Sequence, residues 1–481
     1  MNTKMVRYIL CRMLGVEAAL LLVPVLVAVI YQEKCGIVFL IPIVILCLLF
    51  WVAGRKRPEH GQIYGKEGMV IVALAWILWS LFGAMPFTLS GYIPIYVDAF
   101  FETVSGFTTT GSSIIPDVEV LPHCLLFWRS FTHWIGGMGV LVFVLVVTSL
   151  DRKNSMYLMR AEVPGPEKDK LVPKAMSTAR ILYGMYLILT VIEMVFLVIG
   201  GMNLFDSMIF SFGSAGTGGF SNYADSVAHF NSAYIDGVIT VFCALFGVNF
   251  ALFYFMILGD FKSILKNEEL RTYILLIAGA TAAIMLNIHS LYPTIGKSFR
   301  YAVFQVVTVI TTTGYSTADF AQWPMFSKAV LMMLTVIGAC ASSTGGGIKV
   351  SRLLVGMKCV KREIVQLAHP KSVGIIRIGG KKVSSDVLRT IYIYFIAYVG
   401  ILIGSVLLVS LDNFDFETTF SAVLTTLGNV GPGMAKVGPM GNFAEFSPLS
   451  KLILCFDMLA GRLEIFPFLV LFTAPAWRRK F

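Results

Sequence analysis

Ten long apolar segments constrain what this chain can fold into more than any other feature of its sequence. A membrane-spanning helix takes about 20 apolar residues. Of the 481 residues, 57% are hydrophobic and only 14% are charged, so much apolar surface must face lipid. The sequence therefore predicts an all-α polytopic protein in a lipid bilayer, with spans near 8–31, 36–54, 68–90, 122–149, 180–202, 232–259, 270–291, 325–358, 388–411 and 448–475.

The distribution of basic residues predicts the side on which each loop lies. Ten spans place both termini on one side, together with the loops near 55–67, 150–180, 260–271 and 349–389. Cytoplasmic loops collect Lys and Arg. These loops and the termini hold all but eight of the 38 basic residues, and the eight are Lys34, Arg129, Lys297, Arg300, Lys328, Lys436, Lys451 and Arg462. We therefore predict cytoplasmic N- and C-termini, a topology that explains the net charge of +10 without nucleic acid as a partner.

Residue patterns typical of enzymes and of cofactor sites are missing from the sequence. The eight cysteines form no CxxC pair and the six histidines form no HExxH motif, so neither predicts a metal site. IGKS (295–298) lacks the first glycine of a phosphate loop. GNVGPG (428–433) lacks the third glycine of a dinucleotide fingerprint, because position 436 is Lys. We predict that the chain is not an enzyme and binds no organic cofactor.

Four segments on the outer side share one pattern, an amphipathic stretch of about three helical turns followed by a turn at glycine. Each is too short to span and is followed by a full apolar span. Irregular backbone within a membrane is tolerated only where protein or water encloses it, so we expect these segments to enter the membrane and return. They read DAFFETVSGFTTTGSS (98–113), DSMIFSFGSAGTGGFS (206–221), YAVFQVVTVITTTGYS (301–316) and FETTFSAVLTTLGNVG (416–431).

The glycine turns have the chemistry of a potassium filter. Potassium exchanges its hydration oxygens for rings of backbone carbonyls, and extended Thr–Gly backbone supplies such rings. Glycine permits the backbone angles that turn successive carbonyls toward one axis. Small residues also ease helix packing in membranes, but four equivalent outer turns favour a pore. The predicted potassium-binding residues are Thr109, Thr110, Gly111, Thr217, Gly218, Gly219, Thr312, Thr313, Gly314, Thr426, Leu427 and Gly428.

The spacing of the four turns divides the chain into repeats. Each interval between glycines holds one span down, a basic inner loop and one span up. The repeating unit is thus membrane helix, pore helix, glycine turn and membrane helix, used four times around one pseudo-fourfold pore. The predicted units are two extra N-terminal spans (1–67), repeat 1 (68–179), repeat 2 (180–269), repeat 3 (270–387) and repeat 4 (388–481).

These segments resemble the Trk/Ktr/HKT superfamily of potassium transporters, and within it the TrkH/TrkG branch. The two extra N-terminal spans fit that branch, although the filters depart from the pattern at Gly218, Leu427 and Asn429. The resemblance covers essentially the whole chain. Three further stretches are similar to hallmarks of the family: WRSFTHWIGGMGVLVF (128–143), SSTGGGIK (342–349) and DMLAGRLEIFPFLVLF (457–472).

The resemblance implies potassium uptake across the bacterial cytoplasmic (inner) membrane. It also implies a homodimer that sits on a cytosolic ring of TrkA-type nucleotide-binding regulatory subunits. The inner loops at 150–180 and 349–389 are large enough to bind such a subunit.

Two elements below the filter are candidate parts of a gate. Gly345, Gly346 and Gly347 interrupt the span at 325–358. They fit either a kinked, tightly packed helix or, as in the TrkH-like proteins, an intramembrane loop that blocks the path. Arg462 lies mid-span, where a charge must face protein or water. The resemblance implies a cationic barrier in the pore, and the alternative is a structural ion pair with Asp457 or Glu464.

Three other functions remain open from sequence alone. A sodium-permeable member of the same superfamily would favour serine at the first filter glycine, but Gly111 is present. A secondary carrier for an organic solute predicts charged residues at the midplane of inverted repeats, and a membrane-embedded enzyme predicts a catalytic cluster. The sequence leaves open whether ions flow through a channel or are coupled to protons or sodium.

Overall fold

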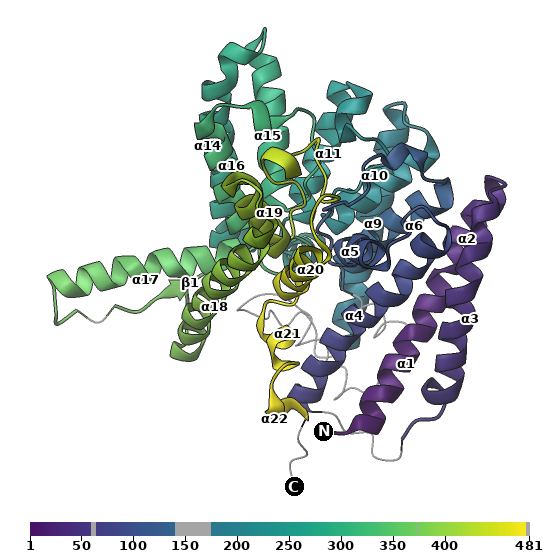
Figure 1. Ribbon diagram of the computed structural model, residues 1–481. Coiled ribbons are helices and arrows are strands. Elements are labelled where there is room, and N and C mark those ends of the chain that lie inside the picture. The colour runs from purple at the N-terminus through teal and green to yellow at the C-terminus, as the bar shows by residue number, and fades with distance from the viewer. Residues whose placement is uncertain (59–63, 140–174, 373, 478–481) are drawn as a thin grey trace.

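The computed structural model describes residues 1–58, 64–139, 175–372 and 374–477 (Figure 1). Helices make up nearly all of its regular structure, so the predicted all-α membrane class is confirmed. Six helices of the described part are long and apolar enough to cross a membrane. They include both N-terminal spans and the first span of every repeat: Thr3–Ile30, Lys34–Gly54, Gly65–Leu89, Arg180–Ile199, Glu268–Leu291 and Ser385–Asp412.

The N-terminal hairpin packs against the first repeat at one edge of the molecule (purple in Figure 1). Pro24 lacks the N–H that would bond the carbonyl of Leu20, and the first span is accordingly divided at Leu21. The hairpin is bonded to the start of α6 (His123–Gly137), because the Glu33 carboxylate accepts hydrogen bonds from the backbone N–H groups of His123 (2.7 Å) and Cys124 (3.0 Å). Its elements are α1 (Thr3–Leu20), α2 (Leu22–Ile30), a 3-10 turn (Lys34–Phe39), α3 (Leu40–Leu49) and a π-helical turn (Phe50–Gly54).

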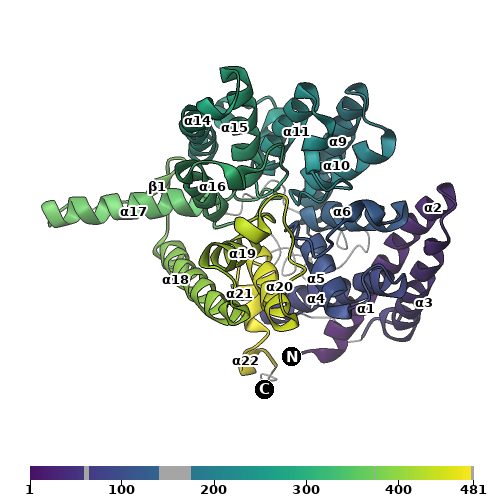
Figure 2. The ribbon, with the colours of Figure 1, turned by 45° about the horizontal axis from the view of Figure 1, so that its top comes forward.

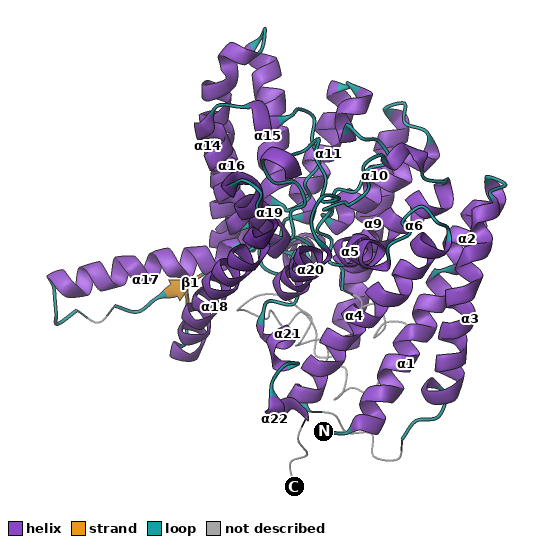
Figure 3. Cartoon of the chain, viewed as in Figure 1, coloured by secondary structure: helices purple, strands orange, loops and turns teal. Residues whose placement is uncertain are grey.

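The remaining helices form four groups that follow one another around a common centre (Figure 2). Each group holds a first membrane helix, a short helix and a second helix. Loops gather at the centre, where the short helices end (Figure 3). The groups are α4 (Gly65–Leu89), α5 (Tyr96–Phe107) and α6 (His123–Gly137); α9 (Ala175–Ile199), α10 (Leu204–Gly216) and α11 (Ala233–Phe246) with α12 (Phe250–Ile257); α14 (Glu268–Ile288), α15 (Ile295–Ile310) and α16 (Met325–Ile337); and α18 (Ser385–Val409), α19 (Phe416–Gly428) and α20 (Pro448–Arg462).

Two of the second helices, in repeats 2 and 4, are broken where the sequence predicted continuous spans. In the expected span 232–259, α11 and α12 meet at 93°. Gly247 allows that bend, because an added Cβ would lie 2.6 Å from the Tyr273 hydroxyl oxygen, and Asn249 starts the new helix by accepting from the Ala251 N–H (2.9 Å). The expected span 448–475 breaks after Arg462 and resumes in α21 (Phe466–Val470).

The expected spans 325–358 and 122–149 also differ from single helices. A long loop separates α16 from α17 (Val350–Ala368), at the glycines that the sequence had singled out. In the first repeat, α6 ends at Gly137. The rest of 122–149, and the inner loop of 150–180 up to residue 174, lie outside the described residues.

The other elements lie outside the four groups, and of these α22 (Ala474–Trp477) lies beside the chain ends (Figure 1). Helix α17 projects sideways from the body and leads to the two-stranded hairpin, whose register pairs Arg377 with Lys382 and Ile378 with Lys381. N and C lie close together in this view. These elements are α13 (Phe261–Lys266), β1 (Arg377–Ile378), β2 (Lys381–Lys382) and α22 (Ala474–Trp477).

Candidate functional site

The four short helices end in the same backbone turn. The residue after each helix, or one beyond, is left-handed, with φ of 55° at Thr109, 55° at Thr217, 60° at Thr312 and 54° at Asn429. In every case the next N–H bonds back to the carbonyl five residues earlier, which is the 6→1 bond of a Schellman motif. These bonds are Thr110 to Ser105 (2.9 Å), Gly218 to Gly213 (2.8 Å), Thr313 to Thr308 (2.8 Å) and Val430 to Thr425 (2.9 Å).

The position of this turn in the fourth repeat differs from the one that the sequence pattern predicted. Thr426, Leu427 and Gly428, the predicted filter residues there, are the last three residues of helix α19. The residues with the backbone of the other turns are Asn429, Val430 and Gly431, three positions later. Asparagine tolerates the left-handed region better than most residues, so Asn429 takes the place that threonine fills in the other repeats.

The four turns touch one another in a closed ring. A Cβ added to Gly111 would lie 1.9 Å from the Gly218 carbonyl oxygen, and one on Gly219 would lie 2.0 Å from that of Thr313. A Cβ on Gly314 would lie 2.1 Å from the Val430 carbonyl oxygen, and one on Gly431 would lie 2.7 Å from that of Thr110, which closes the ring. All four glycines have φ between 75° and 94°, a region that disfavours side chains. Each repeat therefore needs glycine here on two grounds, space and backbone angle.

A cavity of about 130 Å³ is lined by the four ring glycines and by residues that follow the turns. It is lined from all four repeats, by Ser112, Ser221, Ser316 and Pro432 among others. Tyr223 also lines it and donates a hydrogen bond to the Asp206 carboxylate (2.8 Å). Burial and this hydrogen bond raise the pKa of Tyr223 to about 12, so its phenol stays neutral at physiological pH.

A buried ion pair supports the first two turns. Arg129 Nε lies 2.6 Å from a carboxylate oxygen of Glu102, and both side chains are at most 4% exposed. Glu102 also accepts from the Ile114 N–H (2.9 Å), just beyond the first turn. Arg129 donates to the Ser221 carbonyl (2.9 Å), just beyond the second, and stacks on the Phe220 ring at 3.5 Å. The pair thus fixes the chain that leaves two neighbouring turns.

The ring of His133 explains the glycine in the second turn. His133 Nδ1 bonds the Gly106 carbonyl (2.8 Å) and its ring packs on Phe220. A Cβ on Gly218 would lie 2.4 Å from His133 Nδ1, so threonine, present at the same place in Thr110 and Thr313, does not fit. Position 218 differs because histidine occupies the space behind it, and the backbone of the turn is unchanged.

The loop between α16 and α17, residues 338–349, packs against the helix ends of repeats 3 and 4. The Gly346 N–H donates to the Thr312 hydroxyl (2.6 Å). A Cβ on Gly346 would lie 2.5 Å from the Gly428 carbonyl oxygen, and one on Gly345 would lie 2.8 Å from that of Thr311. The glycines therefore let the loop approach the two turns more closely than any side chain would allow.

Repeat 2 and the first helix of repeat 3 hold the same loop. The Cys340 N–H donates to the Gly247 carbonyl at the bend between α11 and α12 (3.1 Å). The Glu269 carboxylate, buried in the first turn of α14, accepts from the N–H groups of Ala341 (2.7 Å) and Ser351 (3.2 Å). The Glu269 carboxylate therefore bonds near both ends of the loop. Within the loop, the side-chain ammonium of Lys349 donates a hydrogen bond to the Gly345 carbonyl.

Arg462 connects this loop to the first repeat. Its guanidinium donates to the carbonyl oxygens of Thr344 (2.6 Å), Gly136 (2.6 Å) and Gly137 (2.9 Å). The acids that the ion-pair alternative offered have other partners: Asp457 accepts from Ser405 (2.7 Å), and Glu464 pairs with Arg352 (2.6 Å). The loop and Arg462 thus lie together, in contact with all four repeats.

Sequence reasoning missed Glu102, Glu269 and the role of Asn429. Arg129 was noted among the basic residues outside the inner loops. A charge in an otherwise apolar helix signals a buried partner, and that signal was present for Arg129 and Glu102 but did not identify the pairing. Glu269 looked like part of a basic inner loop, and its contact with residues about 70 positions away leaves no local signal.

Comparisons with known proteins place the whole chain among bacterial transporters. The TrkH family model, described as cation transport protein, matches residues 36–478. The Trk system potassium uptake protein TrkH of Salmonella typhimurium is 37% identical over 467 residues, 95% of this chain and 96% of that protein. The Trk system potassium uptake protein TrkG of Escherichia coli strain K12 is 33% identical over 486 residues, which cover 99% of this chain and 100% of that protein. The crystal structure of the potassium transporter TrkH from Vibrio parahaemolyticus superposes with a TM-score of 0.89 at 31% identity, covering 99% of this chain and 100% of that one.

Replacing Arg129 by Met should destabilise the protein strongly, because Glu102 would keep a buried charge without its partner. Loss of one partner of a buried pair costs about 3–5 kcal/mol. The matched control is Lys328→Met, since Lys328 pairs with the half-exposed Glu417 at 2.9 Å, and that change should cost less than about 1 kcal/mol. Thermal unfolding of the purified variants in detergent measures both. Equal effects of the two substitutions would contradict the supporting role of the buried pair.

Proposed function

The chain belongs to the TrkH family of cation transport proteins, and from this premise we propose that it takes up potassium through the ring of four glycine turns. As a member of that family it is a membrane transporter and not an enzyme. The single observation that carries the proposal is the closed ring, in which each glycine lies against a carbonyl oxygen of the next repeat. Four such segments offer four oxygens per layer around one axis, the arrangement that replaces the hydration shell of potassium.

The proposed filter residues are those of the structural alignment. They are Thr109, Thr110 and Gly111 in repeat 1, Thr217, Gly218 and Gly219 in repeat 2, Thr312, Thr313 and Gly314 in repeat 3, and Asn429, Val430 and Gly431 in repeat 4. Their first two N–H groups bond back to the short helices, so the ion meets acceptors and not donors. The short helices also point their C-terminal ends at the ring, and that end of a helix dipole attracts cations.

The loop 338–349 is the proposed gate. It lies against the ring on the side of Thr312, and its contacts with the other repeats leave it in the way of an ion that has passed the filter. To open this gate, the hydrogen bond from the Gly346 N–H to the Thr312 hydroxyl has to break. Arg462 holds the loop at Thr344 and adds a fixed positive charge, which repels a passing cation most strongly where water is scarce.

The proposed partners are a second copy of the chain and a cytosolic TrkA-type nucleotide-binding subunit. Helix α17 supports the first, because it projects from the body with exposed apolar side chains at Val360, Ile364 and Leu367, which are 61%, 62% and 83% exposed. A helix that projects from the body in this way offers a surface on which a second copy can pack. The second follows from the family resemblance, as does placement in a bacterial inner membrane with both termini in the cytoplasm.

A channel and a proton-coupled transporter differ in whether a proton gradient changes the ion flux. Flux of potassium, rubidium, sodium and lithium into liposomes that hold the purified chain is therefore measured with and without such a gradient. The proposal requires potassium and rubidium to enter faster than sodium and lithium. Equal entry of all four ions would favour the sodium-permeable alternative, and no entry of any would contradict the proposal.

Serine at a filter glycine should weaken the preference for potassium over sodium. Gly111→Ser and Gly431→Ser each force a side chain against a carbonyl at a positive φ, so the ring must open. We expect each variant to lose about 1.4 kcal/mol of discrimination, which lowers the ratio of rubidium flux to sodium flux roughly tenfold. Rubidium and sodium flux in liposomes, normalised to folded protein, measures this.

Gly428→Ser is the matched control for the fourth repeat, because Gly428 ends a helix, and the nearest atom to an added Cβ is 3.1 Å away. This variant should keep most of the discrimination. If it loses discrimination while Gly431→Ser retains it, the fourth turn is centred on Gly428 after all.

Deleting Gly345–Gly347 should raise flux in the absence of any partner subunit. The shortened loop can no longer reach the Thr312 hydroxyl, while the ring keeps its own backbone bonds. Ion preference should therefore stay close to that of the parent chain. Liposome flux and a thermal unfolding curve measure both properties, and a well-folded deletion with unchanged basal flux would return the loop to a packing role.

Arg462→Ala should also raise flux, because it removes a charge that stays protonated at any physiological pH. Arg462→Lys should retain most of the barrier, since charge and position matter there more than the geometry of the guanidinium. Thermal stability is measured beside flux because Arg462 also bonds the carbonyls of Thr344 and Gly136. Lower stability with no gain in flux per folded molecule would contradict the barrier.

A further inference from the structure

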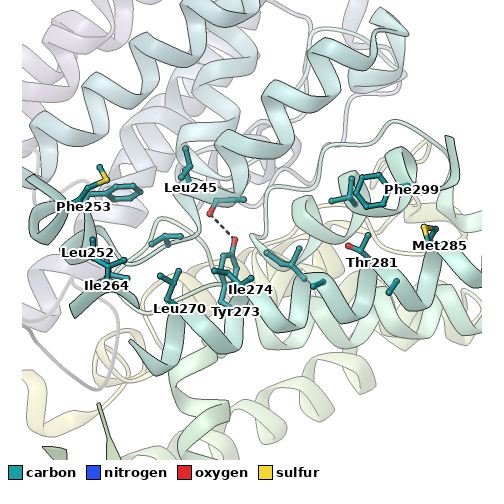
Figure 4. A pocket seen from close by; sticks show the side chains of 17 residues that line it. Leu245, Leu252, Phe253, Ile264, Leu270, Tyr273, Ile274, Thr281, Met285 and Phe299 are labelled. Carbon is teal, nitrogen blue, oxygen red and sulfur yellow. Dashed lines mark hydrogen bonds between the residues drawn. The ribbon is translucent and has the colours of Figure 1, made fainter. Parts of the chain in front are cut away.

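A lateral cavity of about 650 Å³ lies between repeats 2 and 3, away from the ring (Figure 4). It exists because α11 and α12 meet at 93°, so the bent span does not fill the space beside α14. The lining side chains are almost all apolar, among them Leu245, Leu252, Phe253, Ile274, Met285 and Phe299. The volume falls in the range of small-molecule sites, about 300–1,000 Å³.

The dimensions of the cavity match a lipid chain. Its wall on α14 runs from Leu270 to Met285, a rise of about 22 Å at 1.5 Å per residue. One leaflet of the hydrocarbon core is about 15 Å deep, so the cavity is long enough for an acyl chain that enters from one leaflet. The polar groups on that wall are few: the Tyr273 hydroxyl bonds the Ala244 carbonyl (3.1 Å), and Thr281 is buried.

Basic residues mark one end of the cavity. Ile264 of α13 and Leu270 of α14 line this end of the cavity. Lys262 and Lys266 lie within one helical turn of Ile264 on the same short helix, Arg271 follows Leu270 directly, and all three are exposed. The acids of this stretch are occupied: Asp260 caps α13 at Ser263, Glu268 pairs with Lys358, and Glu269 is buried under the loop.

We propose that this cavity binds one acyl chain of an anionic phospholipid from the cytoplasmic leaflet, with the headgroup phosphate at Lys262, Lys266 and Arg271. Surface lysines and arginines attract anionic lipids of that leaflet. The apolar wall accepts the chain, and the exposed cations next to Ile264 and Leu270 select the headgroup. The placement of these cations on the cytoplasmic side follows from the predicted topology.

The occupied cavity stabilises the closed loop, an effect that rests on the proposed gating function. Tyr273 forms part of the cavity wall, and a Cβ on Gly247 would lie 2.6 Å from its hydroxyl oxygen. Gly247 in turn accepts from the Cys340 N–H of the loop (3.1 Å). One layer of residues thus separates the lipid chain from the loop, and filling the cavity holds the bend that the loop bonds to.

Lipid retention by the purified full-length chain tests the site without reference to transport. Native mass spectrometry compares phosphatidylglycerol with phosphatidylcholine of the same acyl chains. Ala282→Trp fills the cavity from an exposed position of its wall, and Lys262→Gln with Lys266→Gln removes headgroup charge. The expected result is retention of phosphatidylglycerol by the parent, and roughly tenfold weaker retention in both variants.

Matched controls separate the site from general lipid contact. Leu286→Trp adds the same ring to α14 at a position 68% exposed that does not line the cavity, and Arg389→Gln removes an exposed charge from α18. Both should retain lipid like the parent. Equal retention by all variants, equal retention of phosphatidylcholine, or a second copy of the chain in place of lipid would overturn the proposal.

Basal flux in liposomes of the two lipids tests the effect on the loop. Flux should be lower in phosphatidylglycerol than in phosphatidylcholine, and Ala282→Trp should abolish the difference. An unchanged difference in that variant would overturn the coupling. A failure of the potassium proposal looks different, because cation flux would then be missing in both lipids while lipid retention stayed intact.

Discussion

Each glycine turn lies against a carbonyl oxygen of the next repeat, with no space for a side chain between them, and the four contacts close into a ring. Irregular backbone inside a membrane must be enclosed in this way, because its peptide groups have no lipid partner. The ring tolerates unequal residues, since Thr110, Gly218, Thr313 and Val430 occupy equivalent places with the same backbone bond. What the four repeats share is therefore a backbone geometry, and their side chains differ according to what packs behind them.

The ring and the loop below it are mechanically connected. Thr312 belongs to the third turn and accepts from Gly346 of the loop (2.6 Å). Asn429 belongs to the fourth turn, and its side-chain amide donates to the Thr110 hydroxyl (3.0 Å) and to the Met458 carbonyl in α20 (2.9 Å). The loop is thus bonded directly to the third turn, while the fourth turn is bonded to the first turn and to α20. In the proposed function, selection rests on the ring's own backbone bonds and gating on the contacts of the loop.

The sequence predicted the class, the first spans and three of the four turns, because apolar length and the Thr–Thr–Gly or Thr–Gly–Gly pattern are local signals. It misplaced the fourth turn, since Thr426–Leu427–Gly428 imitates that pattern inside a helix while Asn429 makes the turn. Of the broken second helices it anticipated only the glycine interruption. The bend at Gly247 packs against the hydroxyl of Tyr273, and a contact between residues far apart in sequence leaves no local signal.

Heavy-ion diffraction tests the central claim, that the ring binds the transported ion, most directly. Crystals of the chain grown in potassium are transferred to rubidium, whose anomalous scattering locates it. The account predicts rubidium on the ring axis, within coordination distance of the carbonyls of Thr110, Gly218, Thr313 and Val430, and no equivalent density after transfer to lithium. Density elsewhere in the protein with none on that axis would contradict it.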